Sequence, residues 1–181
     1  MSQLVYIVGA SGVGKDALMA YTRRRINGGS PVIFGHRYIT RPQTESSENH
    51  IAITPEEFIL RRDAGLFALH WESHGLYYGI GVEIDVWMAG GFNVVVNGSR
   101  QYLPVAVKRY PQMKTIIIEA DPEVIRQRLE SRGREDAAEI SQRLMRQPAV
   151  PQVLEGGVVR IQNNGPLEEG GDALYSLLTL R

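Results

Sequence analysis

The most informative part of the sequence for the fold is a glycine-rich stretch near the start of the chain, Gly9-Ala10-Ser11-Gly12-Val13-Gly14-Lys15-Asp16. It follows the apolar residues 4–8, which predict a buried strand, and it precedes residues 17–21, which have helical character. A strand, a glycine-rich loop and a helix in this order are the setting that a phosphate-binding loop requires. The glycines let backbone N–H groups turn toward a polyphosphate, the helix N-terminus adds its dipole, and Lys15 adds a full charge. The stretch therefore predicts binding of a nucleoside triphosphate.

The last position of this loop departs from the usual pattern. Such loops end in Ser or Thr, whose hydroxyl ligates Mg²⁺, whereas this one ends in Asp16. Residues 92–96 predict a strand that is followed by Asn97, where many such enzymes have a carboxylate that helps to hold the waters of the metal. Asp16 can take over this role and hold Mg²⁺ directly or through water. Alternatively Asp16 only caps the helix, because the helix dipole favours an acid there.

The composition is that of an ordinary globular protein. The chain has 181 residues, of which 43% are hydrophobic and 22% charged, and its formal net charge is zero. No global field therefore favours nucleic acid or acidic membranes. The chain has no cysteine, which excludes disulfides and thiolate metal sites and suits a reducing compartment. Its start leads directly into a strand without a signal peptide, and no apolar run reaches membrane-spanning length, so we expect a cytoplasmic protein.

Strand-like and helix-like patterns alternate along the chain, which predicts an α/β fold with a parallel sheet. The expected strands are residues 4–8, 32–34, 92–96, 114–118 and 158–161, and the expected helices include 82–88, 121–129, 137–146 and 173–180. Residues 36–80 break the alternation, although residues 54–58 have the cap, proline and carboxylates of a helix start. We read residues 36–80, called the insert below, and residues 132–146 as covers of an active site in one domain spanning residues 1–181.

Several motifs resemble the guanylate kinase branch of the nucleoside monophosphate kinases. After the phosphate-binding loop come Thr40-Arg41-Pro42 and Leu76-Tyr77-Tyr78-Gly79. Arg128-Leu129-Glu130-Ser131-Arg132-Gly133 and Gln142-Arg143-Leu144 resemble the lid of that family. The resemblance extends over nearly the full length. It implies a P-loop kinase with a five-stranded parallel sheet, an acceptor-binding insert at residues 36–80, and a helical lid at residues 132–146 that closes over ATP.

The departures from this family concern the acceptor. Thr44 stands near the place of a second phosphate-binding arginine, and His50 matches an assisting tyrosine. Leu69 replaces the carboxylate that would read the guanine ring, Ile80 replaces a hydroxyl residue, and Asn97-Gly98-Ser99-Arg100 replaces paired aspartates. Guanine recognition needs a buried acceptor for the ring N–H groups, because a site without one does not repay their desolvation. We therefore expect an acceptor other than GMP.

A closer resemblance is to the ribose 1,5-bisphosphate phosphokinase family of bacterial phosphonate catabolism. It is carried by Gly14-Lys15-Asp16, His36-Arg37-Tyr38-Ile39-Thr40-Arg41, Glu48-Asn49-His50-Ile51-Ala52, Gly75-Leu76-Tyr77-Tyr78-Gly79 and Val94-Val95-Val96-Asn97-Gly98-Ser99-Arg100. The resemblance implies that ATP phosphorylates the 1-phosphate of ribose 1,5-bisphosphate, giving 5-phosphoribosyl 1-diphosphate (PRPP) and ADP. This acceptor has two phosphates, two sugar hydroxyls and no base, which suits a site that has lost ring recognition and kept its cations.

The resemblance also implies which residues form the site. The ATP-binding residues would be Gly9, Ala10, Ser11, Gly12, Val13, Gly14, Lys15, Asp16 and Asn163, with Mg²⁺ at Asp16. The acceptor-binding residues would be Arg37, Arg41, His50, Tyr77, Tyr78, Ser99 and Arg100. Lys15, Arg132 and Arg143 are the expected catalytic residues, because phosphoryl transfer depends on positioning and on stabilising charge.

Some assignments have a simpler alternative. Arg134 and Arg146 are further lid candidates or else solvated charges on a helix. Asn163 and Asn164 contact adenine or else form the turn before Gly165. No general base is needed, because the attacking phosphate oxygen is already anionic.

Two other functions remain open at this stage. One is a kinase for GMP or another small phosphorylated acceptor, against which Leu69 and Ile80 argue in the case of GMP. The other is a non-catalytic binding module, since some guanylate kinase-like domains bind phosphopeptides and have lost ATP binding. Lys15 and the lid arginines argue against that module. We expect neither a nucleic-acid nor a membrane partner, and the oligomeric state is left open.

Overall fold

The computed structural model describes residues 2–26, 28–42, 48, 50–132 and 157–179. Thr44, Arg134, Arg143 and Arg146 lie outside these residues, as do the predicted helix 137–146 and nearly all of the predicted lid. Of Arg132, only the backbone is described.

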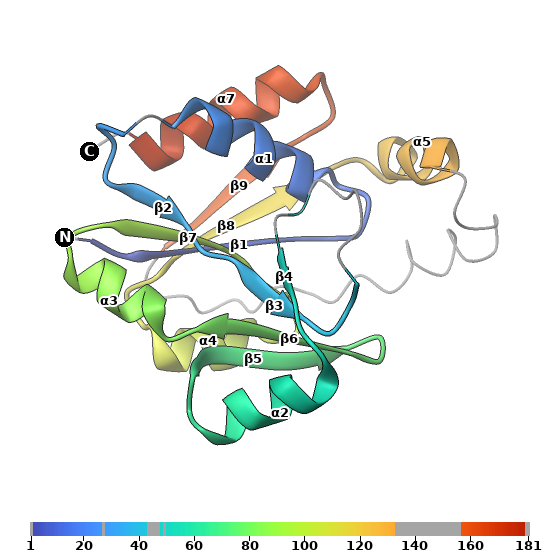
Figure 1. The fold of residues 1–181 in the computed structure, drawn as a ribbon. Helices are drawn as coiled ribbons and strands as arrows, with labels where there is room; N and C mark the ends of the chain where they lie inside the picture. The colour runs from blue at the N-terminus through green and yellow to red at the C-terminus, as the bar shows by residue number, and fades with distance from the viewer. Residues whose placement is uncertain (1, 27, 43–47, 49, 133–156, 180–181) are drawn as a thin grey trace.

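Five parallel strands form the larger of two sheets, in the spatial order β2-β7-β1-β8-β9 (Figure 1). These strands are β1 (Leu4–Gly9), β2 (Val32–Phe34), β7 (Asn93–Asn97), β8 (Lys114–Glu119) and β9 (Val158–Gln162). The three central strands are continuous apolar runs with buried side chains, as expected where helices cover both faces of a parallel sheet. The predicted five-stranded parallel sheet is confirmed.

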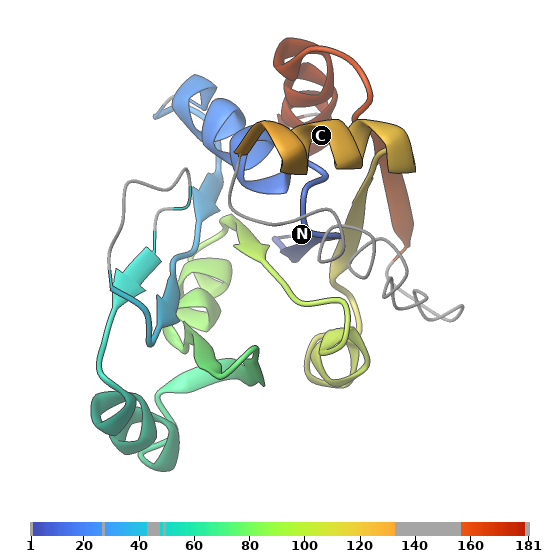
Figure 2. The same cartoon turned by 90° about the vertical axis from the view of Figure 1, so that its right-hand side faces the viewer.

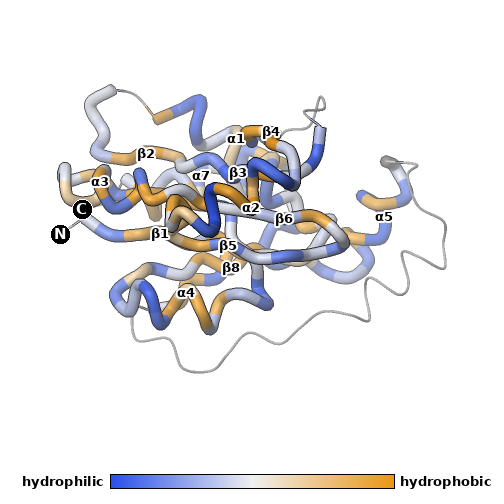
Figure 3. Tube along the Cα trace, turned by 60° about the horizontal axis from the view of Figure 1, so that its bottom comes forward, coloured by the Kyte–Doolittle hydropathy of each residue, from blue (hydrophilic) through white to orange (hydrophobic). Residues whose placement is uncertain are grey.

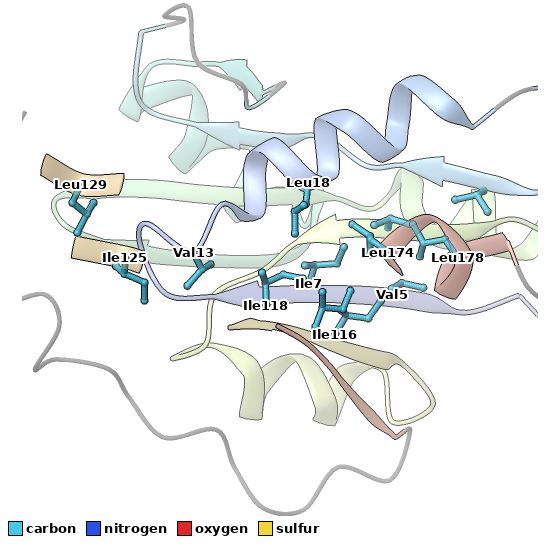
Figure 4. Close-up of a cluster of buried hydrophobic side chains, with 13 residues drawn as sticks. Val5, Ile7, Val13, Leu18, Ile116, Ile118, Ile125, Leu129, Leu174 and Leu178 are labelled. Atoms are coloured by element: carbon cyan, nitrogen blue, oxygen red, sulfur yellow. The ribbon is translucent and has the colours of Figure 1, made fainter. Parts of the chain in front are cut away.

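Successive side chains of β1 enter different cores, because neighbouring residues of a strand point to opposite faces. Val5 and Ile7 pack on one face with side chains of α1 (Lys15–Arg25), α5 (Pro122–Arg132) and α7 (Leu167–Thr179), as Figure 4 shows. Leu4 and Tyr6 pack on the other face with side chains of α3 (Glu83–Ala89), α4 (Leu103–Arg109) and the insert. The helices therefore form two layers around the sheet.

The insert contains a second sheet of four strands, in the order β4-β3-β6-β5. Its strands are β3 (Arg37–Ile39), β4 (His50–Ala52), β5 (Phe67–Ser73) and β6 (Leu76–Gly81). β3 pairs in parallel with β4 and antiparallel with β6, which pairs antiparallel with β5. Figure 2 shows this sheet and α2 (Pro55–Asp63) at the lower left, apart from α5 at the top.

The start of α2 follows from its sequence. Thr54 precedes the helix and its hydroxyl accepts a hydrogen bond from the backbone N–H of Glu57 at 3.2 Å, while Pro55 occupies the first helical turn. A side-chain oxygen at this position satisfies a helix N–H, and proline there loses no hydrogen bond. The predicted helix start at residues 54–58 is confirmed.

The last helix is longer than the sequence predicts. α7 begins at Leu167, ahead of the expected start at residue 173, and includes Gly170 and Gly171. Glycines weaken a helix, but here they allow a close approach to α1: a Cβ on Gly171 would lie 2.2 Å from a ring carbon of Tyr21. Packing between two helices therefore overrides the local preference.

The helix α4 was not predicted at all. It is short, has Pro104 in its first turn, and ends in the basic residues Lys108 and Arg109; orange hydrophobic and blue hydrophilic stretches are visible on α4 in Figure 3. Leu103 and Ala106 are buried beneath the sheet. None of the described helices is long and apolar enough to cross a membrane.

Candidate active site

The phosphate-binding loop joins β1 to α1, and its glycines are required by its backbone. Gly12 and Gly14 have φ of 87° and 88°, in the left-handed region that side chains disfavour. Gly12 also faces α5, because a Cβ there would lie 2.9 Å from Ile125 and 3.1 Å from Leu129. Figure 4 shows these two side chains of α5 beside Val13. The loop is thus shaped by backbone conformation and by helix packing.

Two side chains from distant elements hold the loop at one carbonyl. The oxygen of Val13 accepts a hydrogen bond from Nδ2 of Asn163 at 2.7 Å and another from Nη1 of Arg128 at 3.2 Å. Asn163 is buried, and its Oδ1 has no hydrogen-bond partner among the described residues. Asn163 therefore contacts the loop itself, and its contact with adenine stays a prediction. From the sequence alone, Arg128 has no predicted role beyond its place in the lid-like stretch.

Lys15, Asp16 and Asn97 form a small polar network at the start of α1. The amine of Lys15 donates to Oδ1 of Asn97, and Nδ2 of Asn97 donates to the carboxylate of Asp16 at 2.9 Å. Lys15 Nζ lies 3.7 Å from the same carboxylate. Asn97 is buried at the end of β7, beside β1 in the sheet. The residue that stands in place of a carboxylate therefore joins the two charged groups of the loop.

Burial lowers the pKa of the Lys15 amine to about 8, and the nearby Asp16 carboxylate opposes this shift. Arg37 and Glu48 of the insert also affect this pKa. The side chain of Asp16 is 41% exposed, so its carboxylate remains open to a ligand. Asp16 lies in the first turn of α1, and the hydrogen-bond partner of its carboxylate is Asn97 rather than a free helix N–H.

Glu48 connects the two arginines that are expected to bind the acceptor. Its Oε1 accepts hydrogen bonds from the guanidinium of Arg37, and its Oε2 accepts one from Nη2 of Arg41 at 3.2 Å. The side chain of Glu48 is only 9% exposed. Charged hydrogen bonds of this kind fix the orientation of the planar guanidinium. Sequence reasoning used Glu48 only as part of a motif, because nothing in the spacing shows that it lies between two arginines.

Three polar nitrogen atoms of the insert are buried without a partner. They are Nε of Arg41 and both ring nitrogens of His50, none of which has a hydrogen-bond partner among the described residues. His50 is 2% exposed, and in the sheet its Cα pairs with that of Arg37. Buried polar groups are nearly always hydrogen-bonded, and the Nε–H of Arg41 and a ring N–H of His50 are donors that suit an oxyanion.

The two predicted tyrosines point to different neighbours, as successive residues of a strand do. The guanidinium of Arg37 lies 5.1 Å from the ring centroid of Tyr78. The ring of Tyr77 instead stacks on Phe58 of α2 at 5.2 Å. The structure thus brings Tyr78 to the arginine and places Tyr77 against α2, where its contact with an acceptor stays a prediction.

Tyr6 forms hydrogen bonds to the backbone of the loop after β7. This contact was not predicted from the sequence. The hydroxyl of Tyr6 accepts a hydrogen bond from the backbone N–H of Ser99 at 2.9 Å and lies 3.2 Å from its carbonyl oxygen. Gly98 makes room for the ring, since a Cβ there would lie 2.2 Å from it. Arg100 follows, half-buried, and burial lowers its pKa while Glu119 opposes the shift. A tyrosine in a buried strand resembles an ordinary core residue, so the pattern gave no signal.

Leu69 and Ile80 face each other across β5 and β6. Both are buried in the core that contains Tyr6 and Trp71. The two residues that the sequence resemblance matches to guanine-contacting positions are therefore apolar and buried, and the match itself stays a prediction.

A pocket between α1 and the insert brings the two halves of the site together. Its polar lining consists of Asp16, Arg23, Arg37, Glu48 and Asn97. Asp16 and Arg37 were expected in the site, whereas the other three were not assigned ligand contacts. A phosphate-binding loop at the end of the first strand, with an arginine of the insert across the same pocket, is an arrangement suited to phosphoryl transfer.

Solved structures give the class of this fold. The chain superposes on a guanylate kinase from Anaplasma phagocytophilum with a TM-score of 0.67 and 16% identity, over 99% of this chain and 87% of that one. A sugar kinase from a Janibacter species gives a TM-score of 0.55 and 18% identity, over 99% of this chain and 96% of that one. The fold is that of the guanylate kinase-like P-loop kinases.

Sequence relatives give the family. The ribose 1,5-bisphosphate phosphokinase PhnN of Desulfomicrobium baculatum is 52% identical over 179 residues, which cover 98% of this chain and 95% of the relative. The proteins of the same name from Thiobacillus denitrificans and Burkholderia mallei are 50% and 49% identical, over 98% and 97% of this chain and 93% and 95% of the relatives. No family model matches the chain. The chain belongs to the ribose 1,5-bisphosphate phosphokinase family, which confirms the resemblance seen in its motifs.

Proposed function

We propose that this protein transfers the γ-phosphoryl group of ATP to the 1-phosphate of ribose 1,5-bisphosphate. A bond forms between the γ-phosphorus and an oxygen of the 1-phosphate, the bond to the bridging β-phosphate oxygen breaks, and PRPP and ADP are released. One observation carries the choice of acceptor: Glu48 orients Arg37 and Arg41 in the same insert in which Leu69 and Ile80 form a buried apolar pair. Such a site attracts phosphate and offers nothing to a base.

The catalytic work in this proposal is electrostatic. The charge of the transferring phosphoryl group spreads over its oxygens, so positioned cations and N–H donors supply most of the stabilisation. The loop backbone would hold the β- and γ-phosphates, and Lys15 would bridge them. Arg132 and Arg143 of the proposed lid, residues 132–146, would complete the cage. Since the attacking oxygen is anionic, no side chain has to remove a proton.

Mg²⁺ fits this site through Asp16. The ion usually takes one or two carboxylates, substrate phosphates and several waters rather than a dedicated protein cage. Among the described residues no three His, Asp or Glu side chains form a metal cluster, so the phosphates would supply the other ligands. Asp16 is held by Asn97 and remains partly exposed. The ion would neutralise charge on the phosphates that it joins.

Acceptor assays with direct product identification test the proposal. The purified protein is incubated with ATP, Mg²⁺ and, separately, ribose 1,5-bisphosphate, ribose 5-phosphate, ribose 1-phosphate or GMP, and the products are followed by ³¹P NMR. We expect a new diphosphate signal, attached at the ribose C1, with ribose 1,5-bisphosphate. Formation of GDP at a comparable rate, or no diphosphate signal with ribose 1,5-bisphosphate, would contradict the proposal.

A further inference from the structure

Arg23 is a cation of the central pocket to which the roles described above give no task. It lies on α1 beyond Lys15 and lines the pocket together with Arg37 and Asp16. Arg23 follows Lys15 by eight positions in the same helix, which places their backbones ~12 Å apart along the helix axis. The pocket therefore extends from Asp16, the neighbour of Lys15 in the phosphate-binding loop, to a cation some two helical turns away.

The charge of Arg23 is not matched by a carboxylate in the described part of the chain. Arg37 and Arg41 share Glu48, and Arg25 of the same helix pairs with Asp172. Arg23, in contrast, makes neither an ion pair nor a hydrogen bond with any residue that the structure describes. A solvent-exposed guanidinium at the rim of a pocket is thus available to an anion.

A second pocket adjoins the first at Arg23. The two share Arg23 and Phe34, and the second is also lined by Ser30 and His36. Burial and then the charge of Arg23 lower the pKa of His36, while Glu83 opposes them. Arg23 therefore stands where the two pockets meet and where the insert begins.

We propose that Arg23 binds the 5-phosphate of the acceptor. The inference rests on the proposed function, in which the 1-phosphate lies near Lys15 to receive the γ-phosphoryl group. If the 1-phosphate lies near Lys15, the 5-phosphate must lie in another part of the pocket. Arg23 lines the pocket and has no carboxylate partner among the described residues, so it is available to bind the 5-phosphate. Arg23 would thus distinguish a sugar bisphosphate from a sugar 1-phosphate.

The test compares Arg23→Ala with Arg24→Ala. Arg24 is the adjacent exposed arginine of α1 and is absent from the described lining of both pockets. Steady-state kinetics are measured with ribose 1,5-bisphosphate and with ribose 1-phosphate. We expect Arg23→Ala to raise KM for ribose 1,5-bisphosphate by about tenfold or more, the equivalent of ~1.4 kcal/mol. KM for ATP and for ribose 1-phosphate should stay unchanged, and Arg24→Ala should behave as the wild type.

Calorimetric binding of ribose 5-phosphate, which carries only the distal phosphate, gives a readout that needs no turnover. Arg23→Ala should weaken this binding about tenfold or more relative to the wild type, and Arg23→Lys should recover part of the loss. If Arg23→Ala does not fold, Arg23→Gln is judged by the same criteria. Equal KM values in the Arg23 and Arg24 variants, or an equal rise for both acceptors, would overturn the inference. Weakened ribose 5-phosphate binding in a protein that never phosphorylates ribose 1,5-bisphosphate would instead support the anion site and refute the proposed reaction.

Discussion

The two sides of the pocket are built to bind phosphate in different ways under the proposed function. The loop between β1 and α1 uses backbone geometry, with glycines at positive φ, helix packing against Gly12, and a single cationic side chain, Lys15. The insert uses side-chain charge, with two arginines oriented by Glu48. A backbone site recognises the phosphates that all nucleoside triphosphates share, whereas side chains can be exchanged without loss of the fold. Activity should therefore be lost by changes in the loop and redirected by changes in the insert.

The largest effect is expected at Lys15. Lys15→Ala should reduce turnover to background, because no other described side chain of the loop supplies a positive charge to the β- and γ-phosphates. The fold should persist, which circular dichroism and thermal melting would show. Lys108→Ala on the exposed surface of α4 is the control. Near-native activity of Lys15→Ala would mean that the loop does not bind the nucleotide phosphates.

The proposed lid should come next. Arg132→Ala or Arg143→Ala should lower kcat by about 10³ or more if either acts on the transferring charge as an arginine finger does. Arg126→Ala serves as the control, since Arg126 is exposed on α5. A change of only a few-fold in both lid variants would make them surface residues and leave catalysis to the loop and the insert.

On the insert side, Glu48→Gln should raise KM for the acceptor. An amide has one acceptor oxygen and a donor NH₂, so it satisfies one guanidinium and repels the other. Breaking a buried charge pair costs about 3 kcal/mol or more, and we expect lower thermal stability together with at least a tenfold rise in KM. KM for ATP should change little.

Glu57→Gln is the matched control for that change. Glu57 also pairs with an arginine of the insert, Arg61, at 2.7 Å, but its side chain is 41% exposed and lies on α2. An equal effect of both substitutions on KM would show that Glu48 has no special place in the site.

The smallest expected effect is the pH dependence of activity, which reports on Lys15 of the loop and not on the arginines of the insert. Burial lowers the pKa of Lys15 to about 8 in the free protein, so kcat/KM for ATP should fall above pH 8 as the amine loses its proton. Bound phosphates favour the charged form, so kcat should hold to higher pH. Because the unfolded chain keeps this proton up to about pH 10.4, the unfolded state binds more protons, and Lys15 alone makes stability rise with pH between 8 and 10.4. A flat profile of kcat/KM for ATP up to pH 10 would contradict the low pKa.

Sequence predictability also differs between the two sides. The phosphate-binding loop could be predicted from the sequence, because its left-handed backbone positions require glycine. The glycines therefore recur at a spacing that is visible in the sequence. The bridge by Glu48, the stacking of Tyr77 on Phe58 and the support of Ser99 by Tyr6 were not foreseen. Each joins residues through strand pairing or core packing, and no local pattern marks it. Of the residues in these contacts, the two arginines, Tyr77 and Ser99 are assigned to the site from the sequence, and only through the resemblance of their motifs, whereas Glu48, Phe58 and Tyr6 are not.

The choice of acceptor is tested most directly by the ratio of two specificity constants. Ribose 1,5-bisphosphate and GMP are compared under the same conditions of ATP and Mg²⁺. Leu69 and Ile80 are buried and apolar, so in the proposed site they would leave the edge of a guanine without partners, a cost on the order of several kcal/mol. We expect kcat/KM for ribose 1,5-bisphosphate to exceed that for GMP by about 10⁴, the range in which missing hydrogen bonds discriminate substrates. Comparable constants for the two acceptors would contradict the claim that the insert selects its acceptor by phosphate and not by a base. They would favour a guanylate kinase.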